Sequence, residues 1–176
     1  MKNFITLVSG FLFVISIVSA EPKVLVIDWP VTQKLKSSMT VLSARSMPYP
    51  SGLIDKANAV HLPVYLPSAY AYQETLQMVG EGDFYTVTVP LSAATVFITG
   101  DRTYQQDSNA VTSVSTLAKE LSFIRAEGMV SVDFNRHGAN YTLSIECDQP
   151  DDDQRCTQTR FLQQVYADLV LIGGQP

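Results

Sequence analysis

The strongest constraint on the fold is a run of alternating residues near the C-terminal end of the chain. Within residues 140–147, apolar side chains alternate with polar ones, and the side chains of a β-strand point to opposite faces in turn. Residues 121–126 and 129–135 have the composition of two further strands, and residues 135–138 provide a turn into the third. These segments predict an antiparallel meander whose buried face carries Tyr141, Leu143 and Ile145 or Cys147.

Further strands are expected upstream of the meander. Residues 84–89 and 94–99 have strand length and composition and are separated by a short connection, which favours a hairpin. Residues 59–67 are also rich in β-branched and aromatic residues. Because Pro63 cannot donate to a sheet ladder, we expect this strand to be irregular or to lie at a sheet edge.

Two helices are expected from apolar spacing. One extends over residues 68–79, where Tyr72, Leu76 and Val79 form a single stripe. The other begins after Thr157 or Thr159 and continues to Ile172, with a broad apolar face. Residues 32–45 are interpreted as a weak helix or an extended arm, and residues 104–116 as a surface loop.

The order of these elements defines the fold class. Adjacent strands without regular crossover helices favour an antiparallel sheet. We therefore expect an α+β fold, in which an antiparallel sheet of about five to six strands has two main helices packed on one face. Residues 21–52 are expected to form an N-terminal arm or linker, and residues 53–176 a single globular α+β domain.

The first 20 residues have the pattern of a secretory signal peptide. Residues 4–18 are almost wholly apolar, Lys2 is the only charged residue before Glu21, and small residues precede the expected cleavage site after Ala20. A lipid anchor is not expected, because residue 21 is not cysteine. We expect a periplasmic or secreted protein with no membrane span in the mature chain.

The charge balance argues against one class of partner. The chain has 12 Lys and Arg against 17 Asp and Glu, a net charge of −5, and no cluster of basic residues. Nucleic acid is not an expected partner, because phosphate neutralisation needs clustered Lys and Arg. No motif predicts a cofactor, and the short glycine run at residues 80–82 is interpreted as a turn.

Cys147 and Cys156 are the two cysteines of the chain. In an exported protein an even number of cysteines predicts a disulfide. The segment between them would then be a closed loop. A redox-active pair usually has the closer Cys-x-x-Cys spacing, so we predict a structural bond.

The closed loop is acidic and is the first candidate binding site. Its charged residues are Asp148, Asp151, Asp152, Asp153 and Arg155. A solvated acidic turn, a weak calcium site and a recognition loop for a basic partner are all compatible with this composition. The EF-hand spacing is absent, so we favour the solvated turn and predict no metal.

Tyrosines provide the second candidate site. If Leu62, Val64 and Leu66 face the core, alternation leaves Tyr65 on the outside, and a buried Phe84 would leave Tyr85 exposed. Such a strip could bind a sugar or a peptide. Ordinary core and rim positions explain the same tyrosines. The members of this candidate aromatic strip are Tyr65, Tyr70 and Tyr85.

Catalytic residues are not evident in the sequence. His61 and His137 have no carboxylate or second histidine at a ligand spacing, and no Gly-x-Ser-x-Gly elbow occurs. We therefore favour a non-enzymatic binding or accessory module that acts at the cell envelope on a protein or glycan partner. The alternatives are a small periplasmic hydrolase with a site assembled from sequence-distant residues, and an inhibitor that presents the acidic loop to a basic secreted enzyme.

Overall fold

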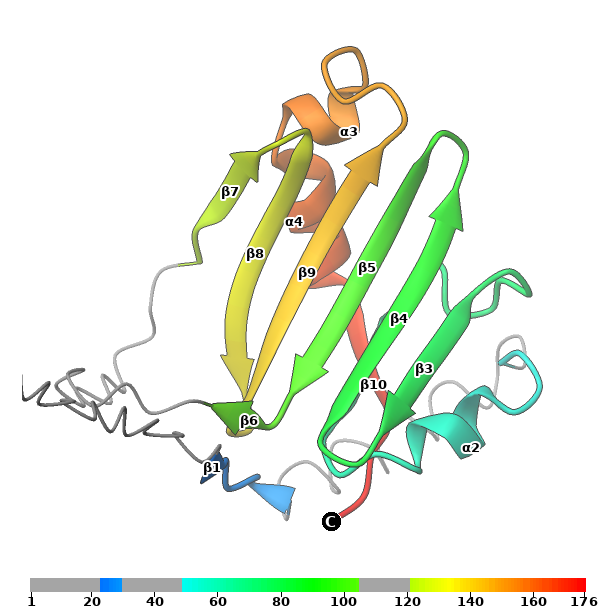
Figure 1. Cartoon of the computed structure of the whole chain (residues 1–176). Helices are drawn as coiled ribbons and strands as arrows, with labels where there is room; N and C mark the ends of the chain where they lie inside the picture. Colours follow the sequence, from blue (N-terminus) through cyan, green and yellow to red (C-terminus); the bar gives the residue numbers. More distant parts are fainter. Residues whose placement is uncertain (1–22, 30–48, 105–120) are drawn as a thin grey trace, which may run out of the picture.

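The computed structural model describes residues 23–29, 49–104 and 121–176 of the chain (Figure 1). At its centre is a six-stranded antiparallel sheet in the order β3-β4-β5-β9-β8-β7. The strands are β3 (Gln77–Glu81), β4 (Phe84–Leu91), β5 (Ala94–Asp101), β7 (Phe123–Ala126), β8 (Met129–Arg136) and β9 (Ala139–Cys147).

Two smaller strand pairs and three short helices complete the described fold. Strand β1 (Lys23–Val24) pairs with β6 (Thr103–Tyr104), and β2 (Val64–Pro67) pairs with β10 (Leu169–Gly173). The helices are α2 (Leu53–Ala57), α3 (Gln154–Thr157) and α4 (Arg160–Ala167). This arrangement confirms the expected α+β class. In the described ranges, no helix combines the length and hydropathy needed to cross a bilayer.

The predicted meander and hairpin are confirmed. Strands β8 and β9 pair from Met129 opposite Glu146 to Arg136 opposite Ala139, and β4 and β5 pair from Phe84 opposite Asp101 to Leu91 opposite Ala94. Along β9, buried residues alternate with more exposed ones from Ala139 to Cys147, as the pattern in the sequence requires.

One face of the large sheet is covered and forms the core. Helix α4 and strand β10 lie behind the sheet in Figure 1. Strand β2 pairs with β10, and all four residues of β2 are buried. The largest fully buried side chains come from the sheet, from β2 and its flanking residues, and from α4: Tyr85, Leu62, Leu66, Ile98, Leu143, Ile145, Leu162, Val60, Val64, Val87, Val89 and Val96.

Two tyrosine hydroxyls of the large sheet form hydrogen bonds with the backbone of the segment around β2. The Tyr65 backbone N–H donates to the Tyr85 hydroxyl at 3.0 Å, and the Tyr141 hydroxyl donates to the Pro63 carbonyl at 2.9 Å. Both bonds satisfy backbone groups that would otherwise be buried without a partner. Burial raises the pKa of Tyr85 and of Tyr141, so both side chains are neutral hydrogen-bonding groups.

The described N-terminal segment lies against the ends of the large sheet's strands. The Leu25 N–H donates to the Arg102 carbonyl at 2.7 Å, and the Asp28 N–H donates to the His137 carbonyl at 3.1 Å. Gly138 has a φ of +86°, and a β-carbon at this position would lie 2.1 Å from the Val26 oxygen. Glycine is therefore needed in this turn both for its conformation and for the close approach of the segment. The division into an arm (21–52) and a single domain (53–176) stays a prediction.

The helix predicted over residues 68–79 is wrong. The region instead contains turns and then strand β3, in which buried Met78 lies between exposed Gln77 and Val79. Residues 77–81 pair with β4 as a strand, although the apolar spacing favours a helix. The alternation of exposed Gln77, buried Met78 and exposed Val79 is the two-residue repeat of a strand.

The helix predicted to reach Ile172 is too long. The C-terminal region forms α3 and α4, and Asp168 is the C-cap of α4. The following apolar residues, Leu169 to Ile172, belong to strand β10, which pairs with β2. A short apolar run suits a strand that is buried on both faces, as most of β10 is. The strand predicted over 59–67 is shortened to β2. The expectation for residues 32–45 and most of the expected loop at 104–116 lie outside the described residues.

Candidate functional site

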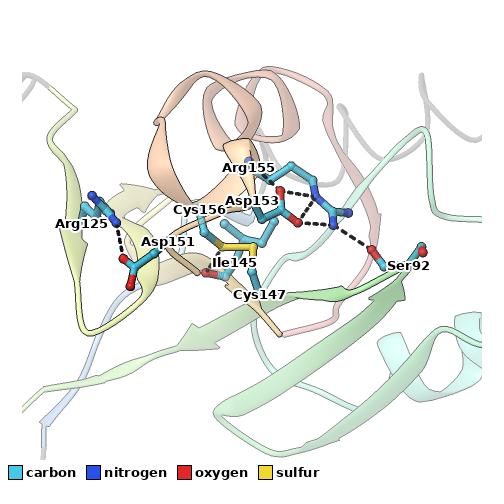
Figure 2. Close-up of a disulfide and its surroundings, with 8 residues drawn as sticks. All are labelled: Ser92, Arg125, Ile145, Cys147, Asp151, Asp153, Arg155 and Cys156. Atoms are coloured by element: carbon cyan, nitrogen blue, oxygen red, sulfur yellow. Dashed lines mark hydrogen bonds and ion pairs between the residues drawn. A yellow bond between two sulfur atoms is a disulfide. The ribbon is translucent and has the colours of Figure 1, made fainter. Parts of the chain in front are cut away.

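The predicted disulfide is present. Cys147, at the end of β9, is bonded to Cys156 in α3, and both residues are buried (Figure 2). The bond closes the acidic loop against the end of the sheet. The Asp148 N–H also donates to the Ala93 carbonyl in the β4–β5 turn at 3.0 Å, so the loop is fixed at its first residue as well.

The acidic loop is organised by two arginine–aspartate pairs. Asp153 caps α3 by accepting from the Arg155 N–H at 2.9 Å, and the Arg155 guanidinium bonds to the same carboxylate and to the Ser92 carbonyl (Figure 2). The hydrogen bonds from Arg155 lower the pKa of Asp153. Asp151 lies 3.1 Å from the Arg125 guanidinium at an exposed position.

The remaining loop carboxylates border a shallow hollow. Its lining consists of Ala93, Asp148, Gln149, Asp152 and Asp153. Within residues 23–29, 49–104 and 121–176, no three or more His, Cys, Asp or Glu side chains are grouped so that they could hold a metal ion. The arrangement fits a rigid acidic turn whose charge is partly compensated by Arg125 and Arg155.

The candidate aromatic strip is not a surface, and this prediction is wrong for two of its three residues. Tyr65 is 4% exposed and Tyr85 is fully buried, whereas Tyr70 is half-buried. Strand β2 is covered on both of its faces, so alternation does not expose Tyr65. Tyr85 lies opposite Gly100, which leaves space for its ring in the core, and it is Phe84 that is exposed.

The two histidines lie in separate bends or turns of the chain. His61 Nδ1 lies 3.8 Å from Asp83 Oδ1, which is an ion-pair distance and longer than a hydrogen bond. The Arg102 guanidinium shares Asp83 at 3.4 Å and also donates to backbone carbonyls. His137 occupies the β8–β9 turn with a φ of +52°. Within the described residues, neither histidine side chain is hydrogen-bonded to a Ser, Asp or Glu side chain.

Sequence reasoning missed a larger feature, the face of the six-stranded sheet that points away from the core. We call it the open face, and it faces the viewer in Figure 1. Seven of its side chains are hydroxyls at positions that alternate with the core residues: Thr86, Thr88, Thr95, Thr99, Ser131, Thr142 and Ser144. Thr86, Thr99 and Thr142 lie in one cross-strand row, and Phe97 is directly between Thr88 and Ser144 in the next.

Apolar side chains mark the two sides of the open face. Val79 and Phe84 are 73% and 46% exposed at the β3–β4 side, and Ile124 and Met129 are 53% and 37% exposed at the β7–β8 side. The two apolar pairs therefore lie at opposite margins of the sheet, with the band of hydroxyls between them.

The charges of the open face are of one sign. Glu81, Asp101, Asp133 and Glu146 occupy its outer positions, and none of its positions on the six strands holds Lys or Arg. Arg125 and Arg136 belong to the other side of the sheet, because their cross-strand partners, Val130 and Ala139, are buried in the core. The open face is therefore an acidic, hydroxyl-rich surface with apolar margins.

Comparison with known proteins gives no relative. No protein-family model matches the chain, and no curated protein or solved structure matches it either.

Proposed function

We propose that this protein is a non-enzymatic binding module of the cell envelope, and that it recognises a basic protein partner through the open face of its sheet. The observation that carries the proposal is the combination of two exposed apolar pairs with a band of hydroxyls between them. Apolar contacts supply affinity, while hydroxyls accept and donate hydrogen bonds without the desolvation cost of buried charges.

The sign of the partner's charge follows from the open face itself. Four carboxylates with no basic side chain among them give a surface that attracts a cationic partner and repels an acidic one. The carboxylates lie toward the outer positions of the sheet, where partly solvated charges steer association rather than dominate affinity.

Introduction of positive charge at the centre of the open face tests the proposal. Thr88→Lys with Ser144→Lys places two cations beside Phe97, and we expect at least about a tenfold loss of affinity for a basic partner. Gln163→Lys with Gln164→Lys makes the same charge change on the exposed side of α4 and should leave affinity within about twofold. The partner is identified by cross-linking in envelope extract, purified, and measured by titration calorimetry with each variant.

The same measurement separates this proposal from its alternatives. Binding that survives both lysine pairs but is lost in Asp148→Ser with Asp152→Ser would move recognition to the acidic loop and favour the inhibitor. A captured glycan, or an acidic protein whose binding is indifferent to the open-face variant, would contradict the proposal.

Export is the other part of the proposal. The apolar leader, the small residues before Glu21 and the disulfide support it, since disulfides persist in oxidising compartments. Expressed from its first codon in a bacterial host, the protein should be released by osmotic shock with Glu21 at its N-terminus, as read by intact-mass spectrometry. Full-length protein in the membrane pellet, or in the cytoplasm with free thiols, would contradict export.

A further inference from the structure

Arg136 is held in an unusual environment at the end of β8, on the core side of the sheet. Its guanidinium carbon lies 4.6 Å from the ring centre of Tyr166 and 5.2 Å from the ring centres of Tyr65 and Phe134. These rings belong to α4, β2 and β8, so three separate elements fix one cation. The rings also pack on each other, with Phe134 and Tyr166 centred 4.9 Å apart in an edge-to-face arrangement.

The charge of this guanidinium is not matched by a nearby carboxylate in the part of the chain that the structure describes. Arg102, Arg125 and Arg155 each lie within 4.0 Å of an aspartate. Among the described residues, the guanidinium of Arg136 instead lies against aromatic rings. Ring faces stabilise a cation but do not accept its in-plane N–H hydrogen bonds. The donor edge of Arg136 is therefore fixed in position while its hydrogen-bonding capacity is unused by the described residues.

Two hydroxyls accompany the guanidinium. Tyr65 and Tyr166 supply two of the rings that lie against Arg136, and each of these rings carries a phenolic hydroxyl. Burial raises the pKa of Tyr65 to about 12, so this hydroxyl carries its proton at physiological pH. Arg136 and Tyr166 are half-exposed, which leaves the cluster accessible from solvent.

We propose that Arg136, with the hydroxyls of Tyr65 and Tyr166, forms a binding site for an oxyanion, a carboxylate or phosphate group. A guanidinium matches both groups through paired N–H donors, and its preorganisation by three rings reduces the entropy lost on binding. The site lies on the opposite side of the sheet from the open face, so it is independent of the proposed function.

Titration by nuclear magnetic resonance tests the site on the mature protein. Sodium phosphate and sodium acetate are added separately at constant ionic strength, with sodium chloride as the reference. We expect saturable shifts of the Arg136 side-chain N–H and of the residue 65 and 166 amides for at least one oxyanion, and none for chloride. Saturation by phosphate alone indicates a phosphoryl ligand, and tighter binding of acetate indicates a carboxylate ligand.

Matched variants decide whether Arg136 is responsible. Arg136→Gln should weaken the oxyanion at least about tenfold, while Arg125→Gln, which removes the same charge from an exposed position, should leave binding unchanged. Tyr166→Phe keeps the ring beneath the cation and removes only a hydroxyl, so it tests the site in a protein that retains the aromatic packing. A wild-type protein without saturable shifts, equal effects of the two arginine variants, or full binding by Tyr166→Phe would overturn the assignment.

Discussion

Gly100→Ala should lower the free energy of unfolding by about 3 kcal/mol, at the upper end of the usual cost of overpacking a core. A β-carbon at this position would lie 2.3 Å from Cε1 of Tyr85 and 2.9 Å from Cδ1 of Leu62. The Tyr85 ring cannot move away freely, because its hydroxyl accepts the Tyr65 N–H and the residue is fully buried. Urea denaturation of the purified mature protein measures the loss.

The neighbouring residue provides the control. Thr99→Ala lies one position away on the same strand but on the open face, and it should change stability by no more than about 0.5 kcal/mol. If the clash with Tyr85 is the cause, Tyr85→Ala and Gly100→Ala together should cost clearly less than the sum of the two single changes. Additive effects, or a Gly100→Ala protein as stable as the wild type, would show that the ring does not occupy this space.

The longest strands of the sheet could be predicted from the sequence. Strands β8 and β9, and the β4–β5 hairpin, follow from alternation over eight or nine residues and from turn residues between them. These patterns are local, and each strand of a pair shows the same alternation of buried and more exposed residues as its partner. The antiparallel sheet of the α+β fold needs no more information than this.

Short segments were not predictable from spacing alone. Leu76 and Val79 fit a helical stripe, but Val79 is exposed and its neighbour Met78 faces the core, because this segment pairs with β4 as a strand. In the C-terminal region, Leu169 and Ile172 extend the apolar pattern of α4, yet β2 pairs with this run as a strand. Propensity gives way to tertiary pairing in both cases.

The candidate sites show the same division. The disulfide could be predicted from cysteine number alone, and the acidic loop from its composition. The burial of Tyr65 could not, because it depends on β2 having β10 beside it and the large sheet in front. A sequence indication of the open face did exist, since Thr86, Thr88, Thr95 and Thr99 occupy half of the outward positions of a hairpin, and none of those positions holds lysine or arginine.

Removal of the disulfide is the other change with a large expected effect. Cys147→Ala with Cys156→Ala should lower the free energy of unfolding by about 2–4 kcal/mol, because the unfolded chain regains the freedom that the closed loop denies it. Alanine is preferred to serine here, since both positions are buried and a hydroxyl would need a new partner. The fold itself should persist, because the strand pairing of the large sheet does not depend on the loop that the disulfide closes.

Reductant provides the matched control for this prediction. Dithiothreitol should lower the stability of the wild type to nearly that of the double variant, and it should have no effect on the variant. The loop retains its bonds from Asp148 to Ala93 and from Arg155 to Ser92 in either protein, so amide exchange near α3 should increase while exchange in β5 and β9 changes only with global stability. Two reactive thiols in the native exported protein, or a wild type whose stability is indifferent to reductant, would show that the bond does not stabilise this fold.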